Sequence, residues 1–228
     1  MKFEVSNLVA SQTGGLTAKL NLSLTAGETL GVSGPSGVGK SVLLNCLADL
    51  VPHQGDMFLD GESCLSMPAH VWRRRVCLLP AESYWWYVTV GEHFGARSIT
   101  GGTSEGHKHP GSMTGFVNSA SGPEQDCFTQ LGFEPEVMQW RVDRLSTGEK
   151  QRLSLLRVLH NQPDVLLLDE PTASLDPVST RKAEACIAHY QQRSSCVVIW
   201  VSHDPAQLRR VADRGLHLDK SGYSEPPL

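Results

Sequence analysis

A glycine-rich stretch near the N-terminus carries the residues with the clearest chemical meaning. It begins at Gly34 and fits the pattern GxxxxGK followed by Ser or Thr at every fixed position. The glycines let the backbone wrap closely around an anion, so that successive amide N–H groups and the positive end of a following helix face it. Lys40 can reach the outer groups of a polyphosphate, and the Ser41 hydroxyl can take one position around Mg²⁺. The candidate phosphate-binding residues are Gly34, Pro35, Ser36, Gly37, Val38, Gly39, Lys40, Ser41 and Val42.

Two adjacent carboxylates end an apolar run in the last third of the chain. Residues 165–168 are Val-Leu-Leu-Leu, and Asp169 and Glu170 follow them. In an open α/β sheet, ligands bind beyond the C-terminal ends of the strands. Asp169 is therefore a candidate Mg²⁺ ligand through water, and Glu170 a candidate for polarising an attacking water. An apolar strand followed by Asp-Glu is a weak indication alone and a stronger one downstream of a phosphate loop.

A helix start about 20 residues before that run allows two interpretations. Ser146 is a good helix N-cap, and Glu149 stands three residues later, as in a capping box. The first interpretation is simply a capped helix. The second is a further anion site, made of the Ser146 hydroxyl and the free amides of the helix N-terminus, with Gly148 inside it. The residues alone favour neither.

The hydrophobic pattern predicts the scaffold that positions these residues. Residues 165–168 and 197–201 are continuous apolar runs, which are typical of buried parallel strands. Residues 148–159 and 179–191 have helical spacing, as do residues 40–50 after the phosphate loop. Strands that alternate with helices predict an α/β sheet with parallel neighbours. Short strands are expected before residue 34, including a half-buried strand at 20–24.

The middle of the chain has a different composition. Residues 95–122 are rich in Gly, Ser and Thr and read as a loop, while residues 124–131 and 134–141 have helical spacing. We interpret about 91–144 as a small inserted subdomain. His93, His107 and His109 could bind a metal ion, but we expect solvated loop histidines.

Composition limits the function classes. The 228 residues suffice for a substantial core, and the net charge of −4 gives no reason to expect a nucleic-acid partner. No two of the six cysteines stand at CxxC spacing, so we expect a reducing cytosol and no zinc site. No apolar run approaches the roughly 20 residues that cross a bilayer. A role at a membrane would therefore come through a partner.

Five motifs in this order and spacing resemble the nucleotide-binding domain of ABC transporters. They are residues 34–41, 145–149, 168–172, 174–176 and 201–204. The resemblance covers nearly the whole chain and implies a P-loop NTPase core with a mostly parallel α/β sheet, an N-terminal antiparallel β subdomain and a small helical subdomain. Residues 1–90 and 145–228 would form the core, and about 91–144 the helical subdomain, of one ATPase domain.

The same resemblance implies a mechanism. Two copies would form a head-to-tail dimer with ATP and Mg²⁺ at the interface. Ser146 and Gly148 of one copy would meet the γ-phosphate held by Lys40 of the other. Glu170 and His203 would be catalytic together with Lys40, and Asp169 and Ser41 would hold the metal ion. Asp176 would couple the two sites.

Three positions depart from the family pattern. Ala81, followed by Glu82, stands where the family usually has a glutamine that reaches Mg²⁺ and the attacking water. Either Glu82 or a water substitutes for the glutamine, or turnover is slower than usual. No aromatic residue lies near Gln12, where one often stacks on adenine. Thr147 replaces a glycine and narrows the approach of backbone to phosphate. We therefore expect retained ATP binding and reduced but measurable hydrolysis.

Four consecutive aromatic residues follow Ala81. They are Tyr84, Trp85, Trp86 and Tyr87. Consecutive residues cannot all face one core, and exposed Trp and Tyr are enriched at interface hot spots. In the family, this segment lies where a membrane subunit docks, so we expect part of it to line a partner groove. Packing between subdomains is the alternative.

These observations predict the ATP-binding and ATP-hydrolysing subunit of a bacterial ABC transporter. Its membrane subunit would be a separate chain, and the location would be cytoplasmic, peripheral at the inner face of the cell membrane. The alternatives are a soluble ABC ATPase in DNA repair or translation, and a regulatory module that closes on ATP with little hydrolysis. The transported substrate and the direction of transport are not encoded here.

Overall fold

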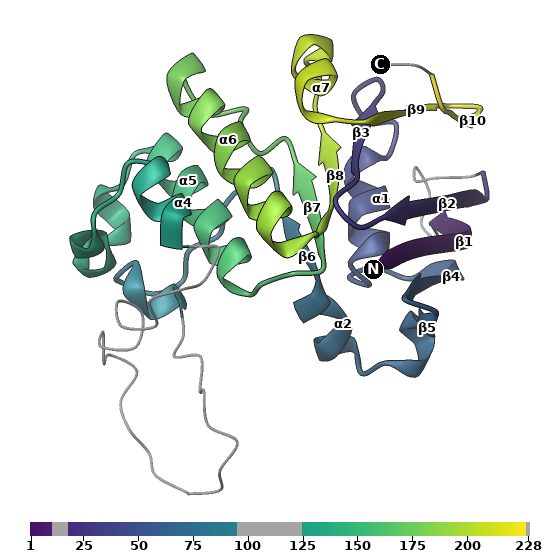
Figure 1. Cartoon of the computed structure of the whole chain (residues 1–228), viewed down its shortest axis with the longest axis horizontal. Helices are drawn as coiled ribbons and strands as arrows, with labels where there is room; N and C mark the ends of the chain where they lie inside the picture. Colours follow the sequence, from purple (N-terminus) through teal and green to yellow (C-terminus); the bar gives the residue numbers. More distant parts are fainter. Residues whose placement is uncertain (11–17, 95–124, 227–228) are drawn as a thin grey trace, which may run out of the picture.

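Two β-sheets organise the chain, one on each side of a helix. The computed structural model describes residues 1–10, 18–94 and 125–226 (Figure 1). The antiparallel sheet has the order β2-β1-β4-β5. Its strands are β1 (Lys2–Ala10), β2 (Leu20–Thr25), β4 (His53–Leu59) and β5 (Glu62–Ser63). The alternation expected at residues 20–24 is present, because every second residue of β2 is buried.

The larger sheet carries the predicted parallel strands in the order β10-β9-β3-β8-β7-β6. They are β3 (Thr29–Ser33), β6 (Val76–Leu79), β7 (Val165–Asp169), β8 (Val197–Val201), β9 (Arg214–Asp219) and β10 (Gly222–Ser224). Only β10 is antiparallel to its neighbour. The fold class expected from the sequence, including the antiparallel N-terminal strands, is therefore confirmed.

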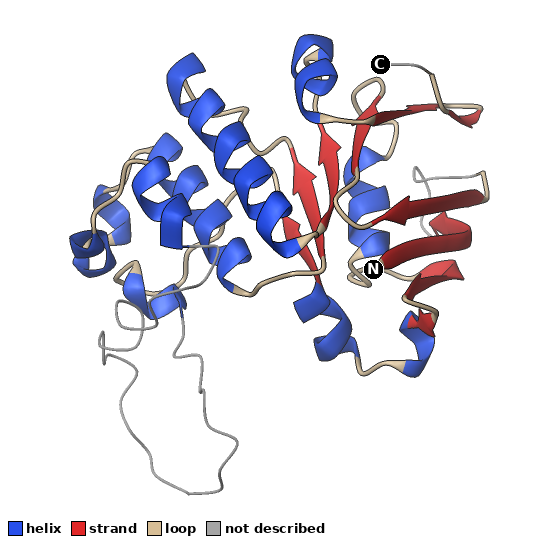
Figure 2. Ribbon diagram, viewed as in Figure 1, coloured by secondary structure: helices blue, strands red, loops and turns tan. Residues whose placement is uncertain are grey.

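Helices cover both faces of the larger sheet (Figure 2). The α-helices are α1 (Lys40–Leu47), α2 (Ala69–Arg75), α4 (Gln125–Gln130), α5 (Thr147–His160), α6 (Pro177–Ser194) and α7 (Pro205–Val211). Short 3₁₀ helices are η1 (Cys64–Ser66), η2 (Gly91–Phe94), η3 (Pro135–Gln139) and η4 (Val142–Arg144). None of the helices in the described part of the chain is both long and apolar enough to cross a membrane.

Burial on both faces explains the continuous apolar runs. In β7, Val165 and Leu167 belong to a core shared with α1 and the antiparallel sheet. Leu166 and Leu168 belong to a second core that also holds residues of α5 and α6. Successive strand residues point to opposite faces, so a strand covered on both sides must be apolar at every position. Figure 1 shows the same order of layers, with α1 between the two sheets and α6 across the other face.

Some predicted boundaries are wrong. Helix α1 ends at Leu47 rather than Leu50, because Asp49 takes a left-handed backbone conformation (φ 53°) and Leu50 is 49% exposed. The helix expected at residues 134–141 is the short 3₁₀ helix η3. Helix α6 begins earlier than expected, because Asp176 caps it and Pro177 takes its first position. The loop at 95–122, with His107 and His109, and the position of Gln12 lie outside the described residues.

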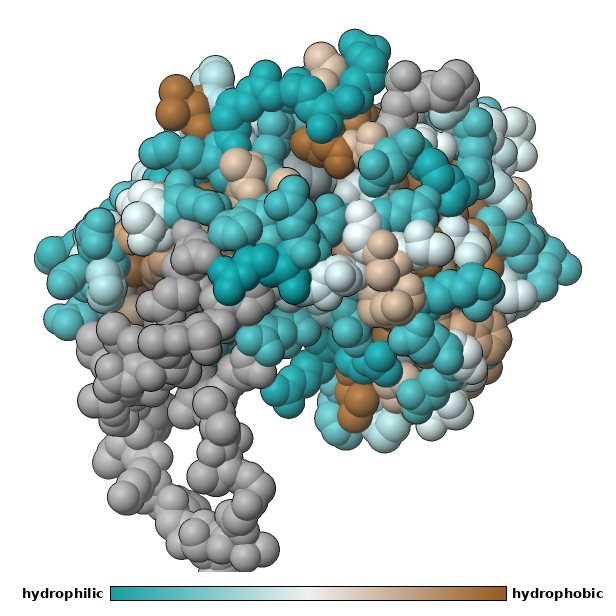
Figure 3. Space-filling model, viewed as in Figure 1, coloured by the Kyte–Doolittle hydropathy of each residue, from teal (hydrophilic) through white to brown (hydrophobic). Residues whose placement is uncertain are grey.

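The surface agrees with the ordinary charge content of the chain. Figure 3 shows that the viewed face is mostly hydrophilic, with small and separate apolar areas.

All six cysteines are buried. Burial raises the pKa of the Cys46 thiol to about 11 and is the main reason that the pKa of Cys64 rises to about 12. These cysteines therefore pack as small apolar side chains.

Candidate functional site

The C-terminal ends of three neighbouring strands bring the predicted site residues to one edge of the sheet. Strand β8 lies between β3 and β7. Val201 of β8 is paired with Val32 on one side and with Asp169 on the other. The phosphate loop after β3, the carboxylates after β7 and His203 after β8 therefore begin at the same level. This common level lets residues far apart in sequence act on one ligand.

The backbone of the phosphate loop requires glycine at Gly34 and Gly37. Gly34 has φ 145°, and a Cβ there would lie 2.3 Å from the carbonyl oxygen of Leu218. Gly37 has φ 76°, with no atom within 4 Å of its Cβ position. Side chains are strained at such φ values. The loop thus packs against β9 at Gly34, while no atom crowds it at Gly37. A loop that binds phosphate through its backbone amides needs such free space beside it.

Lys40 lies across this loop. Its side chain is 6% exposed, and Nζ donates hydrogen bonds to the carbonyl oxygens of Gly34 (2.8 Å) and Pro35 (3.0 Å). Burial lowers the pKa of Lys40, while the nearby charges of Glu170 and Asp169 oppose this change. Lys40, Asp169 and Glu170 therefore lie close enough for their charges to interact.

Glu170 and His203 form a pair. Nε2 of His203 lies 3.0 Å from Oε1 of Glu170. Glu170 has a left-handed backbone conformation (φ 48°), and its N–H donates to the Val201 carbonyl at 3.2 Å. A non-glycine residue in this conformation is strained and persists only where its surroundings hold it. The backbone at the end of β7 therefore places the Glu170 carboxylate next to His203.

The donor set of the site fits Mg²⁺ bound together with a phosphate. The residues that would hold it are Ser41, at the start of α1, and Asp169, which is 7% exposed at the end of β7. The described residues include no group of three or more His, Cys, Asp or Glu side chains that could hold a metal ion without help. Mg²⁺ is usually bound by one or two protein oxygens, with water and substrate phosphates completing its shell.

The capping box predicted at the start of α5 is present. Ser146 N and Oγ donate to Oε2 of Glu149 at 2.8 and 2.7 Å, and Glu149 N donates to Ser146 Oγ at 3.3 Å. These hydrogen bonds from Ser146 lower the pKa of the Glu149 carboxyl. Among the described residues, no hydrogen bond joins this helix start to the phosphate loop. A Cβ at Gly148 would lie 3.5 Å from both Leu175 Cδ2 and Ser174 O, an ordinary packing distance. Packing within the chain therefore does not require glycine there.

The position of the missing glutamine lies at the same edge of the sheet. Strand β6 is paired with β7, with Leu79 opposite Leu168, and Ala81 follows two residues later. Ala81 and Glu82 are both exposed. The methyl group of Ala81 cannot donate or accept a hydrogen bond. The chain thus lacks a polar side chain at this position.

The aromatic residues after Ala81 divide into exposed and packed members. Tyr84, Trp86 and Tyr87 are 63%, 64% and 52% exposed. Trp85 is partly buried against the second core. Arg157 of α5 places its guanidinium 4.8 Å from the Trp85 ring centre and 5.0 Å from that of Trp86, and it donates to the Tyr84 carbonyl at 3.0 Å. Helix α5 therefore holds the aromatic segment by cation–π contacts.

His93 also holds the aromatic segment in place, a role that was not predicted from the sequence. His93 is 8% exposed, so the expectation of a solvated histidine is wrong for this residue. Its Nε2 accepts hydrogen bonds from the backbone N–H groups of Trp86 and Tyr87, both at 2.9 Å, and Nδ1 donates to the Thr89 carbonyl at 2.9 Å. Only a neutral ring protonated on Nδ1 can make all three bonds. In the sequence, only the nearby aromatic residues hinted that His93 packs against them, and they did not indicate these hydrogen bonds.

Burial lowers the pKa of His93. Nearby Arg157 lowers it further, while the hydrogen bond to Thr89 and the charge of Glu92 oppose the change. The folded protein therefore binds this proton more weakly than the unfolded chain does, and acidification acts against the folded arrangement.

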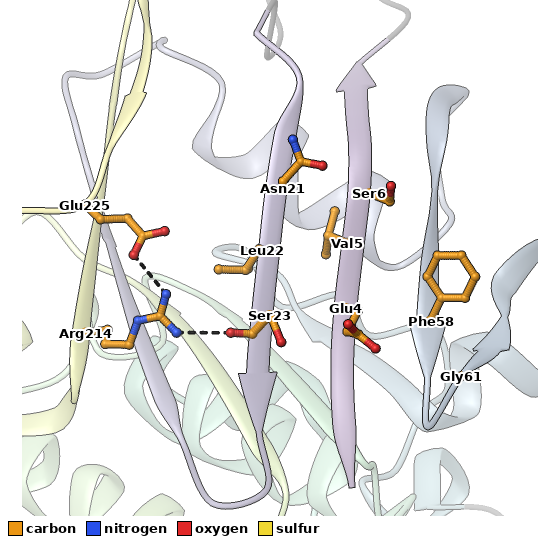
Figure 4. Close-up of a pocket in the computed structure, with 10 residues that line it drawn as sticks. All are labelled: Glu4, Val5, Ser6, Asn21, Leu22, Ser23, Phe58, Gly61, Arg214 and Glu225. Carbon is orange, nitrogen blue, oxygen red and sulfur yellow. Dashed lines mark hydrogen bonds and ion pairs between the residues drawn. The ribbon is translucent and has the colours of Figure 1, made fainter.

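An open hollow on the antiparallel sheet is separate from these residues. Its volume is about 770 Å³, and it lies on the outer face of β1 and β2 (Figure 4). Arg214, one of its lining residues, is already bonded to Ser23, Glu28 and Glu225. None of the predicted site residues lines it.

Comparison with known proteins identifies relatives along most of the chain. Residues 17–173 match the family model of ABC transporters. Protein STAR1 of Oryza sativa subsp. japonica is 32% identical over 195 residues, which cover 85% of this chain and 52% of STAR1. The chain thus spans about half of that relative. The phosphate import ATP-binding protein PstB of Aeropyrum pernix is 34% identical over 84% of this chain and 76% of its own length.

A solved structure shows the same fold. It is the dimeric, post-hydrolysis state of an ATP-binding cassette bound to ADP and Pi, with a TM-score of 0.76 and 20% identity over 98% of both chains. At 20% identity, this similarity shows that the two chains share a fold and nothing further.

The hydrogen bonds of His93 predict a pH-dependent rearrangement of the aromatic segment. Protonation places an N–H against the N–H groups of Trp86 and Tyr87 and breaks both bonds. Because the pKa is lowered in the folded state from an ordinary value of 6.5, the arrangement is unaffected above that pH and loses stability as the pH falls below it. We expect the tryptophan emission to change as the pH falls below about 6.5.

A matched variant isolates this group. His93→Gln keeps a hydrogen-bond acceptor but does not titrate, so its emission should change much less over the same range. An equal change in both proteins would contradict the role assigned to His93.

Proposed function

We propose that this chain, which belongs to the ABC transporter family, is an ATP-binding and ATP-hydrolysing subunit and that two copies of it pair head to tail with ATP at two shared sites. Lys40 and the backbone amides of the phosphate loop hold the phosphates from one copy. Ser41 and Asp169 would hold Mg²⁺, which would neutralise charge on the phosphate oxygens when bound. The observation that carries this proposal is the common level of β3, β8 and β7, which brings Lys40 to the carboxylates.

Glu170 and His203 act on the attacking water in this proposal. The Glu170 carboxylate orients the water and accepts its proton as the water oxygen bonds to the γ-phosphorus and the bond from that phosphorus to the ADP oxygen breaks. His203, whose Nε2 lies 3.0 Å from Oε1 of Glu170, keeps the carboxylate in one orientation and would contact the outer phosphate. Fixing both groups before reaction removes an entropic cost from the barrier.

The start of α5 completes the site of the other copy. Ser146 is exposed and caps this helix N-terminus, and negative charge is stabilised at such a helix end. Two observations support this role. Gly148 is not required by packing inside its own chain, and the same end of α5 makes no hydrogen bond to its own phosphate loop among the residues described. Charge stabilisation is thus supplied between copies.

Hydrolysis is expected to be slow, because Ala81 cannot contact the water or the metal ion. We predict that Ala81→Gln raises steady-state phosphate release. One added hydrogen bond of about 1 kcal/mol in the transition state corresponds to about fivefold in rate. The measurement is phosphate release at saturating ATP and Mg²⁺.

Glu170→Gln is the control for this assay. It removes the proton acceptor and should abolish turnover in both backgrounds. Wild-type release no faster than that of Glu170→Gln would contradict the hydrolytic role and favour a module that only closes on ATP.

The membrane partner docks on the aromatic segment at the inner face of the membrane, in our proposal. Tyr84, Trp86 and Tyr87 are exposed large side chains on a segment that Arg157 and His93 hold in place. A fixed aromatic surface binds a partner with little loss of side-chain entropy. Arg157 belongs to α5, the helix that Ser146 caps, so the docking segment and the ATP site share one helix.

We predict that Trp86→Ala combined with Tyr87→Ala weakens co-purification with the membrane subunit at least tenfold, because each hot-spot side chain is worth about 2 kcal/mol. Trp85 is left unchanged, since it packs against the core. Leu65→Ala, at a site that is 74% exposed and outside this segment, is the control. Equal recovery of the double variant and wild type would contradict the docking site.

A further inference from the structure

A buried polar network connects the loops that carry Glu170 and His203. Its members Ser202, Gln207 and Glu184 are 6%, 4% and 9% exposed. Ser202 directly precedes His203, while Gln207 lies on α7 and Glu184 on α6. Polar groups buried this deeply are costly unless each one is paired. Their pairing therefore shows what the network holds together.

Gln207 is the centre of this network. Its Oε1 accepts a hydrogen bond from Ser202 Oγ at 2.8 Å, on the side of His203. Its Nε2 donates to Thr172 Oγ1 at 2.9 Å, on the side of Glu170, and to Glu184 Oε1 at 2.9 Å. One amide group therefore spans the loop after β8 and the loop after β7.

The surroundings fix the orientation of that amide. Glu184 also accepts hydrogen bonds from Arg210 at 2.8 Å and from Arg181 at 3.2 Å. Although burial raises the pKa of Glu184, the hydrogen bonds from Arg210 and Gln207 outweigh it and lower the pKa overall. The carboxylate is thus ionised and accepts only. A reversed amide would place the carbonyl oxygen of Gln207 against it, so the nitrogen must face Glu184 and Thr172.

We infer that Gln207 is a positioning residue for ATP hydrolysis, which sets the loop of Glu170 and the loop of His203 at a fixed distance from each other. The inference rests on the proposed function of that pair. Gln207 contacts neither member directly. It holds Ser202, which is next to His203, and Thr172, which is two residues after the strained Glu170.

Gln207→Met tests this inference, because Met has a similar length and fills the space without hydrogen bonds. Loss of a supporting hydrogen bond behind a catalytic group typically costs about 10- to 100-fold in activity, as measured for metal sites. We expect kcat to fall at least tenfold while KM for ATP changes less than twofold, because Lys40 and the phosphate loop are untouched. Loss of stability alone would lower the active fraction and would be visible in thermal unfolding.

Gln191→Met is the matched control. Gln191 also donates a partly buried hydrogen bond, from Nε2 to Thr29 Oγ1 at 2.9 Å, but at the start of β3 rather than at its catalytic end. Its kcat should stay within twofold of wild type. A kcat of Gln207→Met within twofold of wild type, or an equal fall in both variants, would overturn the inference.

A swap of the two polar groups provides the rescue. In Glu184→Gln with Gln207→Glu, the new carboxylate can accept from Ser202, from Thr172 and from the new amide nitrogen. The oxygen of the new amide takes the position of Oε2 and accepts from Nε of Arg210. Each single variant should be impaired, and the double variant should recover most of kcat. No recovery, with both single variants folded, would count against the assigned hydrogen bonds.

A spectroscopic reading separates this inference from the proposed function. The NMR resonances of the His203 imidazole should shift in Gln207→Met in the direction seen in Glu170→Gln, and should not shift in Gln191→Met. This result supports the positioning role even if wild-type turnover fails to exceed that of Glu170→Gln. Unchanged His203 resonances in Gln207→Met would overturn the inference while leaving the hydrolytic role intact.

Discussion

The parallel register of β3, β8 and β7 is the constraint on which the site depends. Val201 is level with both Val32 and Asp169, so the three loops that follow these strands start from one line. Burial on both faces keeps the register, because a slip of one residue would exchange the side chains that face the two cores. The chemistry at the strand ends is therefore a consequence of packing along the whole length of the strands.

The loops at this edge are held by a small number of directed contacts. Gly34 lies against the Leu218 carbonyl, Lys40 bonds to the loop that it follows, and Gln207 connects the loops of β7 and β8. These contacts fix the loops relative to one another, which reduces the rearrangement needed for reaction. The start of α5 is different, since its helix end faces outward. In the proposed dimer, a partner copy supplies the anion for this helix end, and Arg157 on the same helix contacts the aromatic segment.

Sequence patterns predicted the parts of the structure that depend on local chemistry or on burial along a whole strand. The β7 and β8 runs, the capping box at Ser146 and the phosphate loop all have this character. The end of α1 at Leu47 was not predictable from spacing, because a left-handed turn at Asp49 overrides it. His93 and Gln207 could not be assigned from sequence either, since their roles depend on partners that only the fold brings near. Such long-range polar contacts have no periodic signature.

ATP-dependent pairing of the purified chain tests the central claim most directly. Glu170→Gln protein should bind ATP and Mg²⁺ without turnover, so light scattering should show its molar mass doubling when both are added. Adding Gly148→Arg, which puts a bulky side chain where the second copy would approach, should leave ATP binding intact and the mass unchanged. A Glu170→Gln protein that binds ATP and stays monomeric, or a Gly148→Arg variant that still pairs, would contradict the account.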